Sequence, residues 1–176
     1  MSDVPATSDA AEPAGIIARQ GRLVRLDVAG TVVFVATLAV AVPLRAERVG
    51  QVVVGAVSVV LFAIGVATSL WAYVSALERS RAVEVGVANL FLLTGSTAPK
   101  QVKRAMGAAL AVQVVAALVG ASIGVAGLEG DQVNALAFGV LVPMFGIGMN
   151  GMWAARYGSY GPRVVAGSRP TNRRIE

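Results

Sequence analysis

The residue types that carry most enzyme and metal chemistry are scarce in this chain. Histidine and cysteine are absent, which removes the commonest metal ligand, the usual proton shuttle, disulfides and thiolate nucleophiles. None of the ten carboxylates lies in the central part of a long apolar stretch, and no two acids are placed for acid–base catalysis. They are Asp3, Asp9, Glu12, Asp27, Glu47, Glu78, Glu84, Glu129, Asp131 and Glu176. We therefore expect no enzymatic activity, no metal and no cofactor.

The polar residues inside apolar sequence are the remaining candidates for a site. Gln113 lies near the middle of one stretch, at the depth where Gly146 is expected on the next. Pro143 is expected to free the carbonyl of Gly139 and to kink its helix, and Asn150 adds a second amide. This polar spot could bind a small ligand or form a gate. A structural hydrogen bond from Gln113 is the favoured interpretation, because amides often join helices in membranes.

Asp27 is the carboxylate closest to a stretch centre. It stands at the edge of the first stretch, beside Arg22 and Arg25. We expect an interfacial ion pair there.

Small residues at a spacing of four predict helix packing. Gly120 and Gly124 form a GxxxG motif, and Ala135 and Gly139 form a similar row in the following stretch. Folding the chain about its turn puts Gly120 level with Gly139. Such rows let helix backbones approach closely in lipid, so we expect these two stretches to pack through them. A dimer interface on Gly120 and Gly124 is the competing interpretation.

Four long apolar stretches define the fold class. About 20 apolar residues suffice for a helix to cross a bilayer, and 56% of the chain is hydrophobic. We predict an all-α, polytopic membrane protein with four transmembrane helices in two antiparallel hairpins. The predicted spans are 24–44, 49–77, 101–127 and 133–155, within one transmembrane domain covering 19–158.

The basic residues predict the orientation. Thirteen of the fifteen lysines and arginines fall in the N-terminal tail, the central connection or the C-terminal tail. The positive-inside rule then places both termini in the cytoplasm, in a multi-pass protein of the cell membrane. We attribute the net charge of +5 to this topology and expect no nucleic-acid partner. The aromatic pairs Trp71 with Tyr73 and Trp153 with Tyr157 are expected at the cytoplasmic interface.

The segments outside the spans carry weaker signals. Residues 1–18 have the composition of a disordered tail, and 159–176 form a basic tail that should contact anionic lipid. Between the hairpins, Val83, Val87, Leu90 and Phe91 have the spacing of one helical face, which predicts an interfacial helix. A cleaved signal peptide over 19–41 is the alternative for the first span.

The last stretch supports a resemblance. Residues 135–158, ALAFGVLVPMFGIGMNGMWAARYG, followed by Pro162 and Arg163, resemble the last helix of small uncharacterised four-helix integral membrane proteins from actinobacteria. The resemblance implies no known activity. A remoter likeness in layout is to the small four-helix accessory protein encoded with ATP synthase.

Two functions follow as expectations. The first is a non-enzymatic accessory or scaffold subunit of a larger membrane complex, with a membrane protein partner or a homo-oligomer. The alternative is a small oligomeric transporter or channel. Its polar pathway would have to come from Gln113, Thr68, Ser69, Ser122 and Asn150.

Overall fold

The computed structural model describes residues 11–44, 47–80, 85–126 and 135–161, with side chains from residue 20 onward. Within these residues the regular structure is helical throughout. Helix α1 spans Ala11–Ala41, α2 spans Arg48–Arg79 and α4 spans Lys100–Ala126. The short α3 covers Val87–Phe91, and the fourth long segment combines the 3₁₀ helix η1, Ala135–Leu141, with α5, Pro143–Tyr157.

The prediction of four membrane-spanning helices is confirmed at the level of length and apolarity. In the described part of the chain, four helical segments are long and apolar enough to cross a membrane: Gln20–Ala41, Arg48–Arg79, Lys100–Ala126 and Ala135–Tyr157. Their limits lie within a few residues of the predicted spans. Most side chains in the first three segments point outward, as expected where lipid rather than water covers a helix.

The N-terminal boundary differs from the prediction. Helix α1 already begins at Ala11, so the expected disorder is wrong for residues 11–18, while 1–10 lie outside the described residues. Residues 127–132, where the chain is expected to turn between the third and fourth spans, and most of the basic tail, 162–176, also lie outside them.

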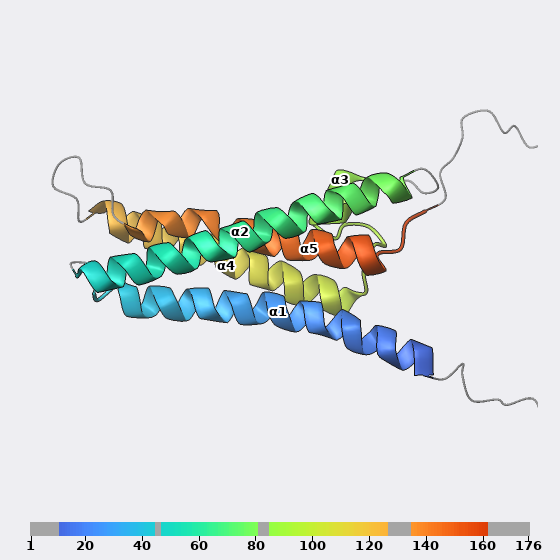
Figure 1. Cartoon of the computed structure of the whole chain (residues 1–176), viewed down its shortest axis with the longest axis horizontal. Coiled ribbons are helices and arrows are strands. Elements are labelled where there is room, and N and C mark those ends of the chain that lie inside the picture. The colour runs from blue at the N-terminus through green and yellow to red at the C-terminus, as the bar shows by residue number, and fades with distance from the viewer. Residues whose placement is uncertain (1–10, 45–46, 81–84, 127–134, 162–176) are drawn as a thin grey trace, which may run out of the picture.

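The long helices run along one axis in alternating directions (Figure 1). The most extensive packing joins α2 to the segment formed by η1 and α5, whereas α1 packs mainly on α4. Helices α1 and α4 both begin at the same end of the bundle and therefore run parallel. The core contains Phe34 of α1, Val54 of α2, Met106 of α4 and Trp153 of α5, each at most 1% exposed.

Pro143 starts a new helix instead of kinking a continuous one. It occupies the first turn of α5, where its missing N–H needs no partner. The preceding residues are wound as a 3₁₀ helix, and the N–H of Val142 donates to the carbonyl of Gly139 at 3.0 Å. The expectation that Pro143 frees this carbonyl is therefore wrong, because the tighter i, i+3 pattern satisfies it.

The connection between α2 and α4 is not one long amphipathic helix in its described part. Helix α3 has five residues, and of its predicted apolar face Leu90 is buried at 2% exposed whereas Val87 is 68% exposed. Val83, which completed the predicted face, lies outside the described residues. Helix α3 packs on α5 and covers it at one end of the bundle (Figure 1).

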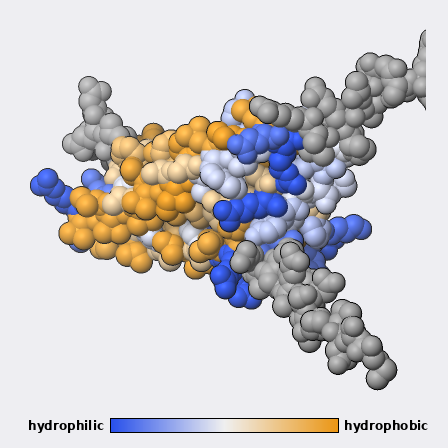
Figure 2. Space-filling view, turned by 45° about the vertical axis from the view of Figure 1, so that its right-hand side comes forward, coloured by the Kyte–Doolittle hydropathy of each residue, from blue (hydrophilic) through white to orange (hydrophobic). Residues whose placement is uncertain are grey.

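One end of the bundle carries most of the described charge, and we call it the basic end. Figure 2 shows most of the hydrophilic residues gathered at this end, a few at the opposite end, and hydrophobic residues over most of the visible surface between them. The described basic residues at this end are Arg22, Arg25, Arg79, Lys100, Lys103, Arg104 and Arg156.

Two arginines of the basic end make defined contacts. Arg156 lies over the ring of Trp71, with its guanidinium carbon 4.7 Å from the ring centroid. Arg79 donates from Nη1 to the carbonyl of Ala155 at 2.6 Å and lies over the ring of Tyr160. These contacts join the end of α2 to the end of α5.

Candidate functional site

A buried hydrogen-bonded cluster lies where α1, α4 and α5 meet. Gln113 of α4 is fully buried, and its Nε2 donates to Thr31 Oγ1 of α1 at 2.7 Å. The same nitrogen lies 3.5 Å from Asp27 Oδ1, and the backbone N–H of Gly146 donates to Gln113 Oε1 at 3.1 Å. We call Asp27, Thr31, Gln113 and Gly146 the central polar cluster.

Helix geometry explains how one amide reaches two neighbouring helices. Side chains on a helix tilt toward its N-terminus, so Gln113 reaches back along α4 toward the basic end. The amide oxygen can approach the backbone of Gly146 because this residue has no side chain. A β-carbon at this position would lie only 2.6 Å from Gln113 Oε1. A glycine is therefore required for the N–H of α5 to meet the amide oxygen.

Asp27 is not part of an interfacial ion pair. Its side chain is 0% exposed, whereas Arg22 and Arg25 are both exposed on the surface of α1. The prediction of an ion pair is wrong because Asp27 lies on the inner face of the helix and its neighbours do not. Asp27 Oδ2 has no hydrogen-bond partner among the described residues.

The sequence contained a signal for the inward position of Asp27. Asp27 follows Leu23 by four residues and precedes Thr31 by four, and Phe34 and Leu38 continue the same face. All five side chains are buried. This spacing places the carboxyl on the core face, whereas the two neighbouring arginines lie off that face.

The other residues of the expected polar spot lie elsewhere. Asn150 is 2% exposed, and its Nδ2 donates to the carbonyl of Phe91 at 3.1 Å, which ties α3 to α5. Asn150 Oδ1 has no partner in the described part of the chain. Pro143 contributes no polar atom and acts through the backbone, as the first residue of α5. Only Gln113 of the three therefore belongs to the cluster.

Two of the remaining polar candidates are bonded within their own helices, whereas Ser69 Oγ has no hydrogen-bond partner among the described residues. Thr68 Oγ1 donates to the carbonyls of Ile64 and Gly65, and the exposed Ser122 Oγ donates to Leu118. Ser69 is buried. In the described part of the chain, these three side chains make no hydrogen bond with the central polar cluster.

The small residues predicted for packing lie at helix contacts, but with different neighbours. A β-carbon on Gly120 would meet Leu38 Cδ2 at 3.0 Å and the carbonyl of Leu136 at 3.9 Å. One on Gly139 would meet the ring of Phe34 at 3.4 Å and Ala117 Cα at 3.8 Å.

The register between α4 and η1 therefore differs by about one turn from the expected one, in which Gly120 faced Gly139. Gly124 is buried on α4, and Ala135 lies toward Gly55 of α2.

Two glycines for which no packing role was predicted lie at a close backbone approach between α2 and α5. A β-carbon on Gly65 of α2 would lie 2.5 Å from the backbone of Met144 and Phe145. One on Gly148 of α5 would collide with Thr68 Oγ1 and the carbonyl of Gly65. These two glycines set the distance between α2 and α5.

The cluster has the chemistry of a helix-joining device. The amide of Gln113 uses both its oxygen and its nitrogen, and the Thr31 hydroxyl accepts from it while donating to the carbonyl of Asp27 at 2.9 Å. A buried amide without partners would be strongly unfavourable in hydrocarbon, so these bonds favour one arrangement of the helices. Among the described residues, Asp27 Oδ2 is the side-chain oxygen of this cluster that is left without a hydrogen-bond partner.

No protein-family model, curated protein or solved structure matches this chain.

Proposed function

We propose that this chain is a non-enzymatic integral membrane protein that acts as an accessory or scaffold subunit of a larger membrane complex. It crosses the cell membrane four times, in two antiparallel hairpins, with both termini in the cytoplasm. The basic end of the bundle then faces the cytoplasm. The proposal includes a membrane protein partner or a second copy of the chain.

One observation carries the accessory role: the central polar cluster is closed. Gln113 and Asp27 are 0% exposed and Thr31 is 6% exposed, so the strongest polar groups inside the helices face each other. The outer faces of α1, α2 and α4 are apolar, with exposed valines such as Val32, Val52 and Val115. A protein built in this way holds its own helices together and offers partners an apolar surface.

The orientation is tested by reporter fusions. A fusion after Arg163 should be active only in the cytoplasm, and one inserted between Arg48 and Val49 should be active only outside. These two results together support the four-span topology. A C-terminal reporter active outside the cell would overturn it.

The accessory role is tested by isolation from native membranes. A C-terminally tagged chain, extracted in a mild detergent, should bring down the same defined membrane protein in repeated preparations. A second chain tagged at the N-terminus controls for capture by the tag. A pure homo-oligomer that makes liposomes permeable to protons or small ions would contradict the proposal.

The alternative of a small oligomeric transporter has one specific observation in its favour. Asp27 Oδ2 is buried without a partner among the described residues, and carboxyls inside membranes often hold protons or ions. Liposomes containing a pH-sensitive dye test this alternative directly. Proton flux that is present with the wild type and lost with Asp27→Asn would favour transport, whereas no flux above empty liposomes would favour the accessory role.

A further inference from the structure

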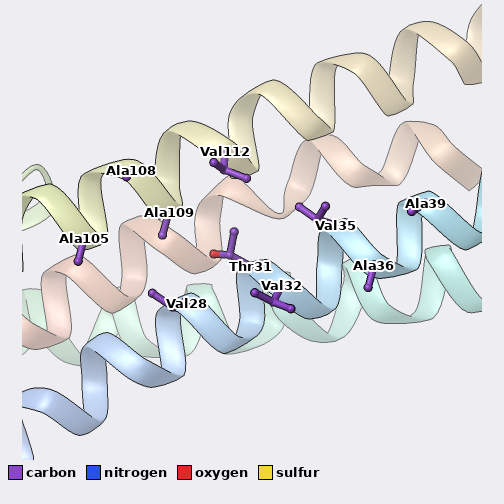
Figure 3. Close-up of a pocket in the computed structure, with 10 residues that line it drawn as sticks. All are labelled: Val28, Thr31, Val32, Val35, Ala36, Ala39, Ala105, Ala108, Ala109 and Val112. Carbon is purple, nitrogen blue, oxygen red and sulfur yellow. The ribbon is translucent and has the colours of Figure 1, made fainter.

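An apolar groove runs between the parallel helices α1 and α4 on the outside of the bundle. Its volume is about 520 Å³, within the range of ~300–1,000 Å³ typical of small-ligand sites. Figure 3 shows the lining side chains of both helices, with Thr31 between them. Val28, Val32 and Ala36 line it from α1, and Ala105, Ala108 and Val112 line it from α4.

The groove exists because α4 presents small side chains to α1. Three of its four lining residues on α4 are alanines, which leave space between two helices that are held together deeper in the bundle by Gln113 and Thr31. The Thr31 hydroxyl already donates to the carbonyl of Asp27 and accepts from Gln113. An apolar occupant therefore breaks no hydrogen bond at the base of the groove.

Positive charge lies at the end of the groove nearest the basic end. Arg25 precedes the lining residue Val28 by three positions, and Arg104 precedes Ala108 by four, so each arginine lies on the same helix face as the groove wall. Both arginines are exposed. Because α1 and α4 both begin at the basic end, the long side chains of these two arginines tilt away from the apolar groove and toward the headgroup layer.

The length of the groove matches one leaflet of a bilayer. The lining residues extend from Val28 to Ala39 on α1, which is roughly 16 Å at the rise of a helix, and over about 10 Å on α4. Half of the hydrocarbon core of a bilayer is about 15 Å thick. An acyl chain whose headgroup sits beside the arginines would therefore be covered along most of its depth.

We propose that this groove binds one acyl chain of an anionic phospholipid, whose phosphate group lies between Arg25 and Arg104. The charge at the mouth selects an anionic lipid, and the apolar walls select the acyl chain. The proposal rests on the membrane location of the bundle but not on its accessory role. The site is distinct from the contact that the C-terminal basic tail is expected to make with the membrane surface.

Quenching by brominated lipids tests the site, because a chain without cysteine accepts a single label. A fluorophore on Ala36→Cys reports on the groove, and one on Ala67→Cys, an exposed position of α2, is the control. The full chain is reconstituted in vesicles containing equal amounts of phosphatidylglycerol and phosphatidylcholine, one of which is brominated in each experiment. The groove label should be quenched preferentially by brominated phosphatidylglycerol, and the control label equally by both lipids.

Charge variants test the role of the two arginines. Each near-surface cation contributes about a fivefold preference for an anionic lipid, so Arg25→Gln and Arg104→Gln should each lower the selectivity by roughly that factor. Arg48→Gln, an exposed arginine at the opposite end, should leave it unchanged. Equal quenching by the two lipids in the wild type, or unchanged selectivity in both arginine variants, would overturn the proposal.

A bulky substitution tests the groove itself. Ala108→Leu should reduce quenching of the groove label by both lipids, while Ala111→Leu, an exposed position of α4 outside the groove lining, should not. If Ala108→Leu instead separates an oligomer into monomers and leaves quenching unchanged, a helix of a second copy occupies the groove and the lipid proposal is wrong. Failure of the partner isolation above would leave these results unaffected.

Discussion

The amide of Gln113 and the hydroxyl of Thr31 join two helices through residues that are 82 positions apart in the chain. Gln113 Nε2 lies 2.7 Å from Thr31 Oγ1, and both side chains are buried. The other end of the amide accepts the N–H of Gly146, so one side chain connects α1, α4 and α5. In a low-dielectric interior such bonds fix the relative position of helices that apolar contacts alone would leave freer to slide.

Replacing Gln113 by leucine should therefore destabilise the bundle. Membrane hydrogen bonds contribute about 0.6 kcal/mol on average, but Gln113→Leu removes the partners of Gly146 N–H and Asp27 Oδ1 together. We expect a loss of about 1–3 kcal/mol, as found when buried polar groups lose their partners. Reversible unfolding in mixed micelles measures it. Gln101→Leu, at an exposed position of α4, is the control, and an equal loss in both variants would contradict the structural role of Gln113.

The close approach of α2 to α5 predicts a second destabilising effect, of similar size. Gly65→Ala would force a methyl group against the backbone of Met144 and Phe145, which cannot move as the end of a side chain can. We expect about 1–3 kcal/mol of destabilisation from this overpacking. Gly107→Ala is the matched control, because nothing lies within 4 Å of its added methyl group. It should be neutral or stabilise the helix by up to ~1 kcal/mol, and a Gly65→Ala variant as stable as the control would contradict the close approach.

The register of α4 against η1 can be checked by disulfide formation in this cysteine-free chain. A β-carbon on Gly139 would lie 3.8 Å from Ala117 Cα, and a disulfide needs α-carbons no more than about 7 Å apart, so we expect cysteines at 117 and 139 to form a disulfide. The pair 120 and 139, which the sequence alone places at one depth, should form it more slowly. To measure the rate of disulfide formation for each pair, the protein is oxidised and then cleaved within the connecting segment. Disulfide-linked fragments are separated from unlinked ones by their shift on a gel. Faster bridging at 120 and 139 would restore the register expected from the sequence.

The contact at the basic end predicts a pH dependence. Burial raises the pKa of the Tyr160 phenol, and nearby Arg79 opposes this in part. The neutral phenol donates to the carbonyl of Ala154 at 3.1 Å. Because the pKa is higher in the folded state, this stabilisation is complete below the ordinary phenol pKa of about 10 and is lost as the pH rises through the folded value. The wild type should therefore lose more stability than Tyr160→Phe above about pH 10. The free energy of unfolding of both proteins, measured against pH, checks this, and parallel curves for the two proteins would refute the prediction.

The lengths of the apolar stretches in the sequence were sufficient to predict the four spans. Apolar length is a property of each segment alone, so the predicted limits needed no knowledge of neighbouring helices. The expected depth of Gln113 relative to Gly146 also came from simple counting, and the structure places a hydrogen bond between them.

The partners of the small residues could not be predicted in the same way. GxxxG marks a surface that permits close approach but does not select the helix that approaches, and glycine and alanine are frequent throughout this chain. Gly120 meets Leu38 of α1, whereas the tightest contact involves Gly65 and Gly148. The conformation of the fourth span also differs from the prediction. Pro143 was expected to kink a continuous helix, whereas the span consists of the 3₁₀ helix η1 followed by α5.

The surroundings of the aromatic residue Trp153 could not be predicted from the sequence either. Its position near the end of a span predicts an interfacial ring, yet it is 1% exposed and belongs to the core. Trp71, with the same predicted role, is 41% exposed and stacks with Arg156. Position along the chain fixes the depth of a side chain, but the packing of neighbouring helices decides whether it faces lipid or core.

The pairing of Gly146 with Gln113 allows the central polar cluster to be tested by a double-mutant cycle. Gly146→Ala alone should be destabilising, because its methyl group would lie 2.6 Å from Gln113 Oε1 and 3.0 Å from Leu110 Cδ1. Gln113→Ala alone leaves the N–H of Gly146 without its partner. In the double variant, the clash with the amide is absent and its hydrogen bond is already lost.

The two losses should therefore not add. We expect the double variant to be more stable than the sum of the single effects predicts, by roughly 0.5–3 kcal/mol, the usual range for residues in contact. Unfolding of all four proteins in the same micelles measures this coupling. Gly107→Ala combined with Gln113→Ala is the control and should show additive effects, because its added methyl group meets nothing within 4 Å. Additive losses for Gly146 and Gln113 would mean that their hydrogen bond does not hold α4 against α5.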